Sequence, residues 1–272
     1  MSIHQKSIQE LNLEDDFLFA KVMSDHEICR RVLEQILGIS IKKVALPEAQ
    51  RTIDILYEGK GIRLDVYVND DKGTVYNVEM QRGRKKELPK RSRYYQGSID
   101  LDLISAGEPY TALRKTYVIF ICTFDPFCEG RHIYTFENSC RENPSLLLGD
   151  EAIKLFLNTE GIQNDVSSDM KEFLTYIRNT TDAFAKQAKN PLIPAIQNKV
   201  TQVKQSKEME VEYMTLLQRD RENIEIGREE GSTWTTKVLK LHTKGIQKKV
   251  IASQLNLDID YVEKIIHDFE ND

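Results

Sequence analysis

The sequence predicts an α/β core followed by an all-α C-terminal region. Over residues 1–165, segments with the alternation of β-strands are interspersed with helical segments. The run KTYVIFICTF at residues 115–124 is almost continuously apolar, which is typical of a strand buried on both faces of a sheet. From about residue 167 onward the patterns are helical. We therefore expect a mixed sheet flanked by helices.

Residues 61–81, GIRLDVYVNDDKGTVYNVEMQ, have the pattern of two strands and a tight turn. Apolar and polar residues alternate on both sides of the turn, so each strand has one apolar and one polar face. A three-residue loop, Asp71-Lys72-Gly73, with Gly73 in the left-handed conformation is a common hairpin connection. This loop would pair Asp70 with Thr74 and so fix the register of the hairpin.

Two carboxylates face each other in this register. Counting back from the turn puts Asp65 directly opposite Glu79, and Gln81 lies on the same polar face. Opposed side chains of antiparallel strands have Cβ atoms about 5 Å apart, so the two carboxylates repel unless a cation compensates. Mg²⁺ takes one or two carboxylates together with water and phosphate oxygens. Our hypothesis is a metal site for phosphodiester cleavage; the alternative is that Asp65 simply faces solvent.

Basic residues follow the hairpin directly. Residues 82–93 carry seven basic side chains and one acidic one, and residues 87–106 have the pattern of a helix with Pro89 in its first turn. This helix must begin near the end of the strand that carries Glu79. Positive side chains here could contact DNA phosphates, which gives affinity rather than sequence readout. The alternative is a solvated basic face.

The composition is that of a soluble protein with a full core and room for a second small module. The chain has 272 residues, of which 40% are hydrophobic and 30% charged, and no apolar run approaches the roughly 20 residues that span a bilayer. The start lacks an apolar signal core, so we expect a cytoplasmic location. The four cysteines lack the spacing of zinc sites and are expected to be reduced. The net charge of −5 argues against indiscriminate nucleic-acid binding.

Flanking segments complete the predicted core. Residues 14–37 are expected to form one helix that ends at Gly38, with Asp15 and Asp16 in its first turn, where the helix dipole favours acidic side chains. One of these carboxylates could instead lean into the metal site. The remaining strand candidates are residues 41–46, 52–57, 131–136 and 152–157.

Long helices are predicted after the core. Residues 170–189 and 194–226 are the candidates, and the second has few apolar positions, which suggests a connector or a helix that packs on a partner. The sequence GREEG at residues 227–231 predicts a break or flexible joint.

The C-terminal segment has the pattern of a small helical module. Helices at residues 234–242, 246–255 and 259–269 have the apolar spacing of a helix-turn-helix. The third is mostly acidic, whereas a helix that reads the major groove should be basic, so a protein-contact or regulatory role is favoured. The predicted domains are residues 1–165, 166–231 and 232–272.

The core sequence resembles a known family. The stretches DDFLFAKVMSD, GIRLDVYVNDDKGTVYNVEMQ, LPKRSRYYQGSIDLDLISAGEPY, YVIFICTFDPF and YTFENSC are similar to those of the PD-(D/E)XK nuclease family transposases, also called recombination-promoting nucleases, of bacteria. The similarity is dense from residue 11 to residue 161. It implies a restriction-endonuclease-like core and DNA cleavage that depends on Mg²⁺, with Mn²⁺ as a substitute.

The resemblance also implies roles for single residues. Asp65 matches the aspartate of the second strand, Glu79 the acidic residue, and Gln81 a position usually filled by lysine. Asp16 matches the acidic residue of the N-terminal helix. Gln81 cannot supply positive charge, although it could orient a water, and Lys85, Lys86 or Lys90 could supply the charge instead. Together with the basic run, the resemblance gives these candidates for DNA contact: Arg82, Lys85, Lys86, Lys90, Arg93 and Gln96.

We therefore predict a metal-dependent DNA endonuclease that promotes recombination or DNA mobility. In this prediction Asp65 and Glu79 hold Mg²⁺, Gln81 positions the attacking water, and Asp16 supports the metal shell. The alternative is a catalytically degenerate DNA-binding or regulatory protein, which Gln81 and the acidic last helix favour. A homodimer would explain how one site per chain cuts both strands. When bound to DNA, the protein would be associated with the bacterial nucleoid.

Overall fold

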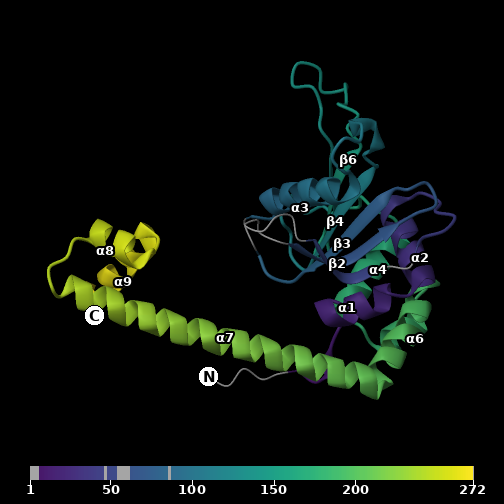
Figure 1. Ribbon diagram of the computed structural model, residues 1–272. Helices are drawn as coiled ribbons and strands as arrows, with labels where there is room; N and C mark the ends of the chain where they lie inside the picture. Colours follow the sequence, from purple (N-terminus) through teal and green to yellow (C-terminus); the bar gives the residue numbers. More distant parts are fainter. Residues whose placement is uncertain (1–5, 46–47, 54–61, 85–86, 272) are drawn as a thin grey trace. The chain divides into compact units, whose positions relative to one another are not determined.

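The computed structural model describes residues 6–45, 48–53, 62–84 and 87–271 (Figure 1). The chain forms two compact units, Met1–Met209 and Glu210–Asp272, each with its own buried apolar cluster. The first unit contains the sheet and the second consists of helices. Among the described helices, none is long and apolar enough to cross a membrane.

The first unit is built on a mixed six-stranded sheet, as predicted. The strand order is β1-β2-β3-β4-β6-β5; β3, β4 and β6 run parallel, and the other neighbours pair antiparallel. Every residue of the central strands β3 and β4 is buried, which confirms the prediction for the apolar run at residues 115–124. The strands are β1 (Glu48–Ile53), β2 (Ile62–Asn69), β3 (Val75–Gln81), β4 (Thr116–Cys122), β5 (Ile133–Phe136) and β6 (Ala152–Asn158).

Helices cover both faces of the sheet (Figure 1). On one face α3 packs against β1 and β4, and its Tyr95 and Ile99 join an apolar cluster with Phe120 and Phe156. On the other face α1 packs against β1, β2 and β3, and α2 and α6 pack against α1. The helices of this unit are η1 (Ile8–Glu10), α1 (Asp16–Met23), α2 (His26–Leu37), α3 (Leu88–Leu103), η2 (Tyr110–Ala112), α4 (Ser168–Arg178), α5 (Asp182–Gln187) and α6 (Leu192–Gln205).

The hairpin of β2 and β3 has the predicted turn and register. Gly73 adopts a left-handed conformation with φ of 80°, and its N–H donates to the Asp70 carbonyl at 3.1 Å. The N–H of Asp70 donates to the Thr74 carbonyl at 3.0 Å, as the predicted pairing requires. The Asp70 side chain also accepts the N–H groups of Lys72 and Thr74, which stabilises the turn.

The polar face of β3 is buried because α3 covers it. Asn77, Glu79 and Gln81 are 0%, 0% and 6% exposed, although the alternation alone would place them in solvent. Their register partners on the next strand, which share this face of the sheet, are Val118, Phe120 and Cys122. The side chains of Asn77, Glu79 and Gln81 therefore form a polar row on β3, which α3 covers and which adjoins apolar side chains of β4.

Residues 14–37 form two helices, so the prediction of one helix is wrong. The chain leaves α1 after Met23 and starts α2 at His26. The Asp25 carboxylate accepts the N–H groups of Glu27 and Ile28, and this cap starts a new helix. The apolar spacing continues across the break, which explains the error. Gly38, with φ of 65°, ends α2 as predicted.

The predicted joint at residues 227–231 is also wrong. The helix α7 (Lys207–His242) runs through GREEG without interruption. Glycine costs about 1 kcal/mol in a helix relative to alanine, but the Arg and Glu residues between these glycines are good helix formers. Other breaks occur instead: residues 170–189 are divided into α4 and α5, and the predicted helix 194–226 is divided at Ser206 between α6 and α7.

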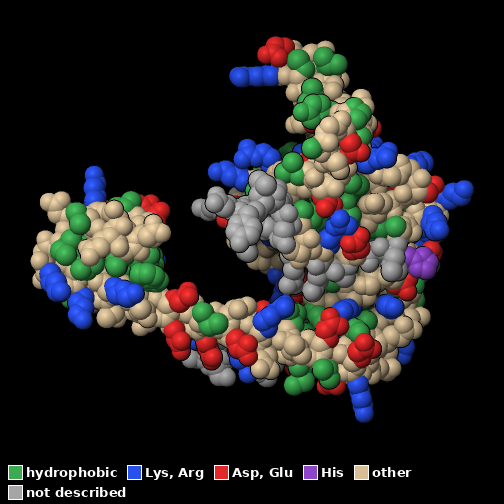
Figure 2. Space-filling model, viewed as in Figure 1, with side chains coloured by type: hydrophobic (Ala, Val, Ile, Leu, Met, Phe, Trp, Pro, Cys, Tyr) green, Lys and Arg blue, Asp and Glu red, His purple; other side chains and the backbone are tan. Residues whose placement is uncertain are grey.

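The end of α7 forms a three-helix module with α8 (Lys248–Leu255) and α9 (Ile259–Asn271), as predicted. Its core contains Val238, Ile251, Ala252, Val262 and Ile266. Basic side chains, drawn in blue for lysine and arginine together, project from the face of this module shown in Figure 2. The α9 surface is acidic, with exposed Asp260, Glu263, Asp268 and Glu270.

The remaining predictions concern shorter segments. Residues 41–46 are no strand in their described part; Val44 forms an isolated bridge to Asp70, and Leu46 lies outside the described residues. β1 begins at Glu48 and includes only residues 52 and 53 of the predicted strand 52–57. Residues 54–57 lie outside the described residues. β5 and β6 confirm the other two strands, and α3 confirms the basic helix, which ends at Leu103.

Replacing Gly73 by alanine should lower the free energy of unfolding by about 1–2 kcal/mol, because an L residue is strained in the left-handed region. The new Cβ would meet Arg114 Cδ at 3.6 Å, an ordinary contact, so backbone conformation determines the loss. Urea denaturation followed by circular dichroism measures it. Gly83→Ala is the matched control, with no atom within 4 Å of its Cβ. Equal losses in the two variants would contradict this description of the turn.

Candidate metal centre

Asp65 on β2 and Glu79 on β3 are neighbours joined by a hydrogen bond. The β2–β3 ladder runs from Asn69–Val75 to Val66–Val78, and the two acidic residues come directly after its last pair. The N–H of Asp65 donates to Glu79 Oε1 at 3.1 Å, and the N–H of Met80 donates to Asp65 Oδ2 at 3.0 Å. Each carboxylate is thus held by the main chain of the opposite strand.

The two carboxylates differ in their exposure to water. Glu79 is fully buried, whereas Asp65 is partly exposed. Burial raises the pKa of Glu79, and the negative charge of Asp65 raises it further, while Arg91 acts in the opposite direction. A cation bound at this pair would relieve both the burial of charge and the repulsion.

The side chain of Arg91, on α3, contacts both functional groups of β3. Its Nη2 donates to Glu79 Oε2 at 3.0 Å, and its Nη1 donates to Gln81 Oε1 at 2.7 Å. Gln81 Nε2 in turn donates to the Gly83 carbonyl at 3.0 Å. Each end of the Gln81 amide therefore has one protein partner, and a second acceptor site and a second donor remain. The role of Gln81 in positioning a water stays a prediction.

Aromatic rings hold the Arg91 guanidinium in place. Its Nε donates to the Tyr95 hydroxyl at 2.8 Å, and its Cζ lies 5.5 Å from the ring centroid of Phe120. Burial, followed by the charge of Glu79, raises the pKa of Tyr95 to about 12, so this hydroxyl remains protonated at neutral pH. The guanidinium is thus fixed on three sides.

Sequence reasoning did not assign Arg91 to the site, although it lay in the predicted basic run. A signal was present in the sequence. Leu88, Tyr95 and Ile99 mark the buried stripe of α3, and Arg91 falls on that stripe at helical spacing. A charged side chain on a buried stripe needs a buried partner, and Glu79 is the acidic residue of the adjoining strand.

Asp15, rather than Asp16, is the buried acidic residue at the start of α1. Asp15 is 5% exposed and forms ion pairs with Arg82 and with Lys6, the latter at 3.7 Å. Asp16 is exposed, and its carboxylate accepts the N–H of Phe17 at 2.9 Å. Arg82 is thus engaged by the protein itself. The role of Asp16 in a metal shell stays a prediction.

The candidate DNA-contacting residues are divided between surface and interior. Lys90 and Arg93 are exposed on α3. Gln96 is 8% exposed and its Nε2 donates to Asp100 at 2.9 Å, so it is placed below the surface rather than on it. Lys85 and Lys86 lie outside the described residues.

Two carboxylates are a donor set that fits Mg²⁺ or Mn²⁺. Within the described part of the chain, no group of three or more His, Cys, Asp or Glu side chains is placed to hold a metal ion. Mg²⁺ fits a site with few protein ligands because it retains several waters and binds substrate phosphates. The candidate ligand oxygens here belong to Asp65 and Glu79.

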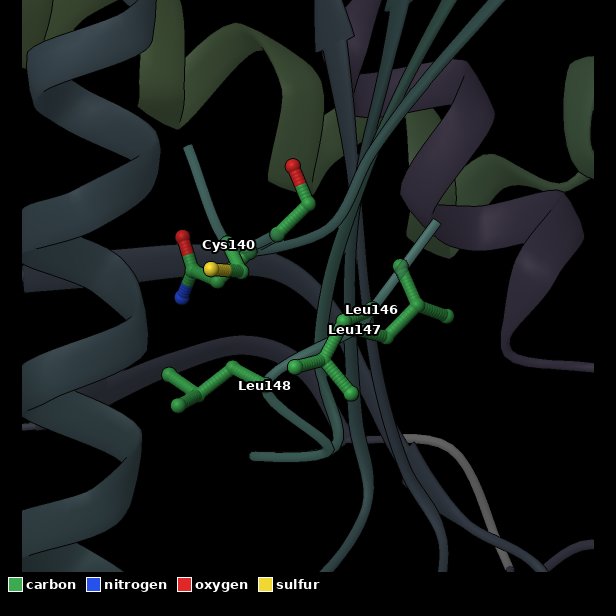
Figure 3. A pocket seen from close by; sticks show the side chains of 6 residues that line it. Cys140, Leu146, Leu147 and Leu148 are labelled. Carbon is green, nitrogen blue, oxygen red and sulfur yellow. The ribbon is translucent and has the colours of Figure 1, made fainter. Parts of the chain in front are cut away.

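An apolar pocket lies elsewhere, in the loop between β5 and β6. Figure 3 shows Leu146, Leu147 and Leu148 beside Cys140 in this pocket, whose other lining residues are Asn138 and Ser139. These side chains include no carboxylate or basic group. The polar row under α3 is therefore the better candidate for chemistry.

The family model of the PD-(D/E)XK nuclease family transposases matches residues 14–227. The mixed sheet with helices on both faces agrees with a PD-(D/E)XK nuclease-like α/β fold. The chain belongs to this family, which confirms the resemblance and indicates a nuclease or transposase-like role. Searches of curated proteins and of solved structures gave no match.

Asp65→Asn should raise the free energy of unfolding at pH 8 in EDTA by about 1 kcal/mol, the equivalent of roughly one pKa unit. The pKa of Glu79 is higher in the folded than in the unfolded protein, so its ionisation destabilises the fold as pH rises through that interval. Removing the Asp65 charge reduces this loss. Urea denaturation at pH 8 and pH 5 tests it, with Asp71→Asn as control; an equal gain at both pH values would contradict the account.

Proposed function

We propose that this protein is a DNA endonuclease that depends on a divalent metal ion, Mg²⁺ or in its place Mn²⁺. The observation that carries the proposal is the pair of neighbouring carboxylates, Asp65 and Glu79, which the main chains of β2 and β3 hold by hydrogen bonds and one of which is fully buried. A buried acid next to a second acid destabilises the fold, so its presence is better explained by function than by stability. Family membership supports a nuclease and hence DNA as the substrate.

The carboxylates would hold the metal in a fixed place between strand and substrate. A bound divalent ion polarises a scissile phosphate and lowers the pKa of an attacking water. Asp65 is the more exposed ligand and would face the substrate, while Glu79 anchors the site from below. Main-chain hydrogen bonds from both strands restrict the two side chains, which keeps the site preorganised.

Lys90 and Arg93 would bind the DNA backbone. Both are exposed on α3, the helix whose Arg91 contacts Glu79 from its buried side. Lysine and arginine contacts to phosphates position the duplex without reading its sequence. We include Lys85 and Lys86 in this proposed surface because they adjoin it in the sequence.

A catalytically degenerate DNA-binding or regulatory protein is the second candidate. It is favoured by Gln81, which stands where the wider superfamily usually has lysine and whose amide is hydrogen-bonded to Arg91 and Gly83. Metal binding separates the two candidates, because a protein that does not cut has no need to bind Mn²⁺ at Asp65 and Glu79.

We also propose a wider setting for the activity. Cleavage would promote recombination or DNA mobility, and a homodimer would bring two sites to the two strands of a duplex. The protein would act in the bacterial cytoplasm, at the nucleoid when bound to DNA. Support for this setting comes from the family to which the chain belongs.

Plasmid cleavage tests the activity directly. Wild-type protein should nick or linearise supercoiled DNA with Mg²⁺ or Mn²⁺ and not with EDTA, and Asp65→Ala should lower the rate at least about 100-fold, because it removes a metal ligand. Asp71→Asn, an exposed acidic residue of the same hairpin, is the matched control. Unchanged cleavage by Asp65→Ala would refute the assignment. DNA binding without cleavage in any metal would favour the degenerate protein.

DNA affinity tests the proposed backbone contacts. The double variant Lys90→Gln, Arg93→Gln should bind any duplex more weakly, and the slope of log K against log salt should fall by about 2, one for each lost phosphate contact. Fluorescence anisotropy at several salt concentrations measures both quantities. Lys186→Gln, an exposed lysine on α5, should leave them unchanged. An unaltered slope in the double variant would remove α3 from the DNA-binding surface.

A further inference from the structure

Arg91 is the positively charged residue that contacts the polar row of β3. Its contact with Gln81 bears on the absence of the lysine that usually occupies position 81. A guanidinium has five N–H donors and no acceptor. Three of these have partners among the described residues: Nε on Tyr95, one Nη1 on Gln81 and one Nη2 on Glu79. The side chain is 26% exposed, so the remaining donors can reach solvent or a substrate.

Gln81 matches the requirements of this guanidinium. Because arginine only donates, residue 81 must present an acceptor, and the Gly83 carbonyl requires a donor on the other side. A glutamine amide satisfies both neighbours at once. A lysine at this position would place a second positive charge within hydrogen-bond distance of Arg91, and like charges at that separation repel strongly.

We propose that Arg91 supplies the positive charge that a lysine at position 81 would supply, and that Gln81 is a positioning residue for it. The inference rests on the proposed nuclease function and extends it to the group that would stabilise charge on the phosphate. The guanidinium offers two N–H donors with fixed geometry, which suits a phosphate better than a single ammonium. Tyr95 and Phe120 hold it from the opposite side.

The arrangement predicts a competition at Glu79. Glu79 Oε2 accepts from Arg91, and the same carboxylate would ligate the metal ion. Two cations beside one carboxylate repel, so Arg91 weakens metal binding while it assists cleavage. A residue with a merely structural role would lower stability without strengthening metal binding.

Four proteins test the proposal: wild type, Arg91→Gln, Gln81→Lys, and the double variant that exchanges the charge between the two positions. In EDTA, each single change should lower Tm by about 5 °C or more. Arg91→Gln leaves the Glu79 carboxylate without its cation, and Gln81→Lys adds a positive charge that repels Arg91. The double variant restores one cation beside Glu79, so its Tm should lie above both singles. This coupling requires no metal and no activity.

Two further measurements use the protein with added metal ion: Mn²⁺ affinity and plasmid cleavage. Arg91→Gln should bind Mn²⁺ about 10-fold more tightly by isothermal titration calorimetry and cleave plasmid at least about 100-fold more slowly. The double variant should recover at least about 10-fold of that loss. Arg141→Gln, an exposed arginine of the loop between β5 and β6 with no place in the proposed site, is the matched control for both quantities.

The outcomes distinguish the inference from the function on which it rests. Additive Tm losses, or cleavage by Arg91→Gln at the wild-type rate, would overturn the role of Arg91. Unchanged or weaker Mn²⁺ binding in that variant would also overturn it, because no competition would exist. Wild-type protein that binds Mn²⁺ but cuts no DNA would overturn the proposed nuclease instead and would remove Arg91 from any role in cleavage.

Discussion

The Glu79 carboxylate has no exposed surface and stands in the central strand of a sheet, and the elements around it compensate for the resulting loss of hydration. β2 contributes the N–H of Asp65, and α3 contributes the guanidinium of Arg91. The compensation is incomplete: burial raises the pKa of Glu79, and the charge of the adjoining Asp65 raises it further against the opposite effect of Arg91. The sheet, the hairpin turn and the helix α3 all affect this one group.

This arrangement separates stability from function. An apolar residue at position 79 would pack against Phe120 on β4, its register partner, without loss of hydration. The chain instead has three polar residues in succession along one buried face, Asn77, Glu79 and Gln81. Such a row does not stabilise the fold by itself. A metal ion and a phosphate bound at the row would explain why these residues are polar. The stabilising contribution comes from elsewhere, above all from the apolar clusters that α3 and α1 form on the two faces.

Much of the fold could be predicted from local patterns, and the failures have physical causes. The hairpin register followed from one glycine, because Gly73 fixes the turn and the turn fixes the strand pairing. The break at Asp25 was missed because a side-chain cap interrupts a helix without changing the apolar spacing. The joint at residues 227–231 was predicted wrongly because two glycines lower helix stability without excluding a helix.

The site was predictable only as far as it lies on one hairpin. Asp65 and Glu79 are brought together by a turn of three residues, so their meeting can be counted along the chain. Arg91 reaches Glu79 through the packing of α3 on the sheet. Helical spacing indicates that Arg91 is on the buried side of α3, but it does not determine which strand residue lies beneath it. The same reason explains Asp15 and Arg82, which are paired across the tertiary fold.

The most direct measurement of the central claim is anomalous diffraction from crystals soaked in Mn²⁺. The account predicts a manganese peak within coordination distance of carboxylate oxygens of both Asp65 and Glu79, with waters in the remaining positions and no peak there in crystals of Asp65→Asn. A fully soaked crystal with manganese bound elsewhere, and none at this pair, would contradict the claim that Asp65 and Glu79 form a metal centre.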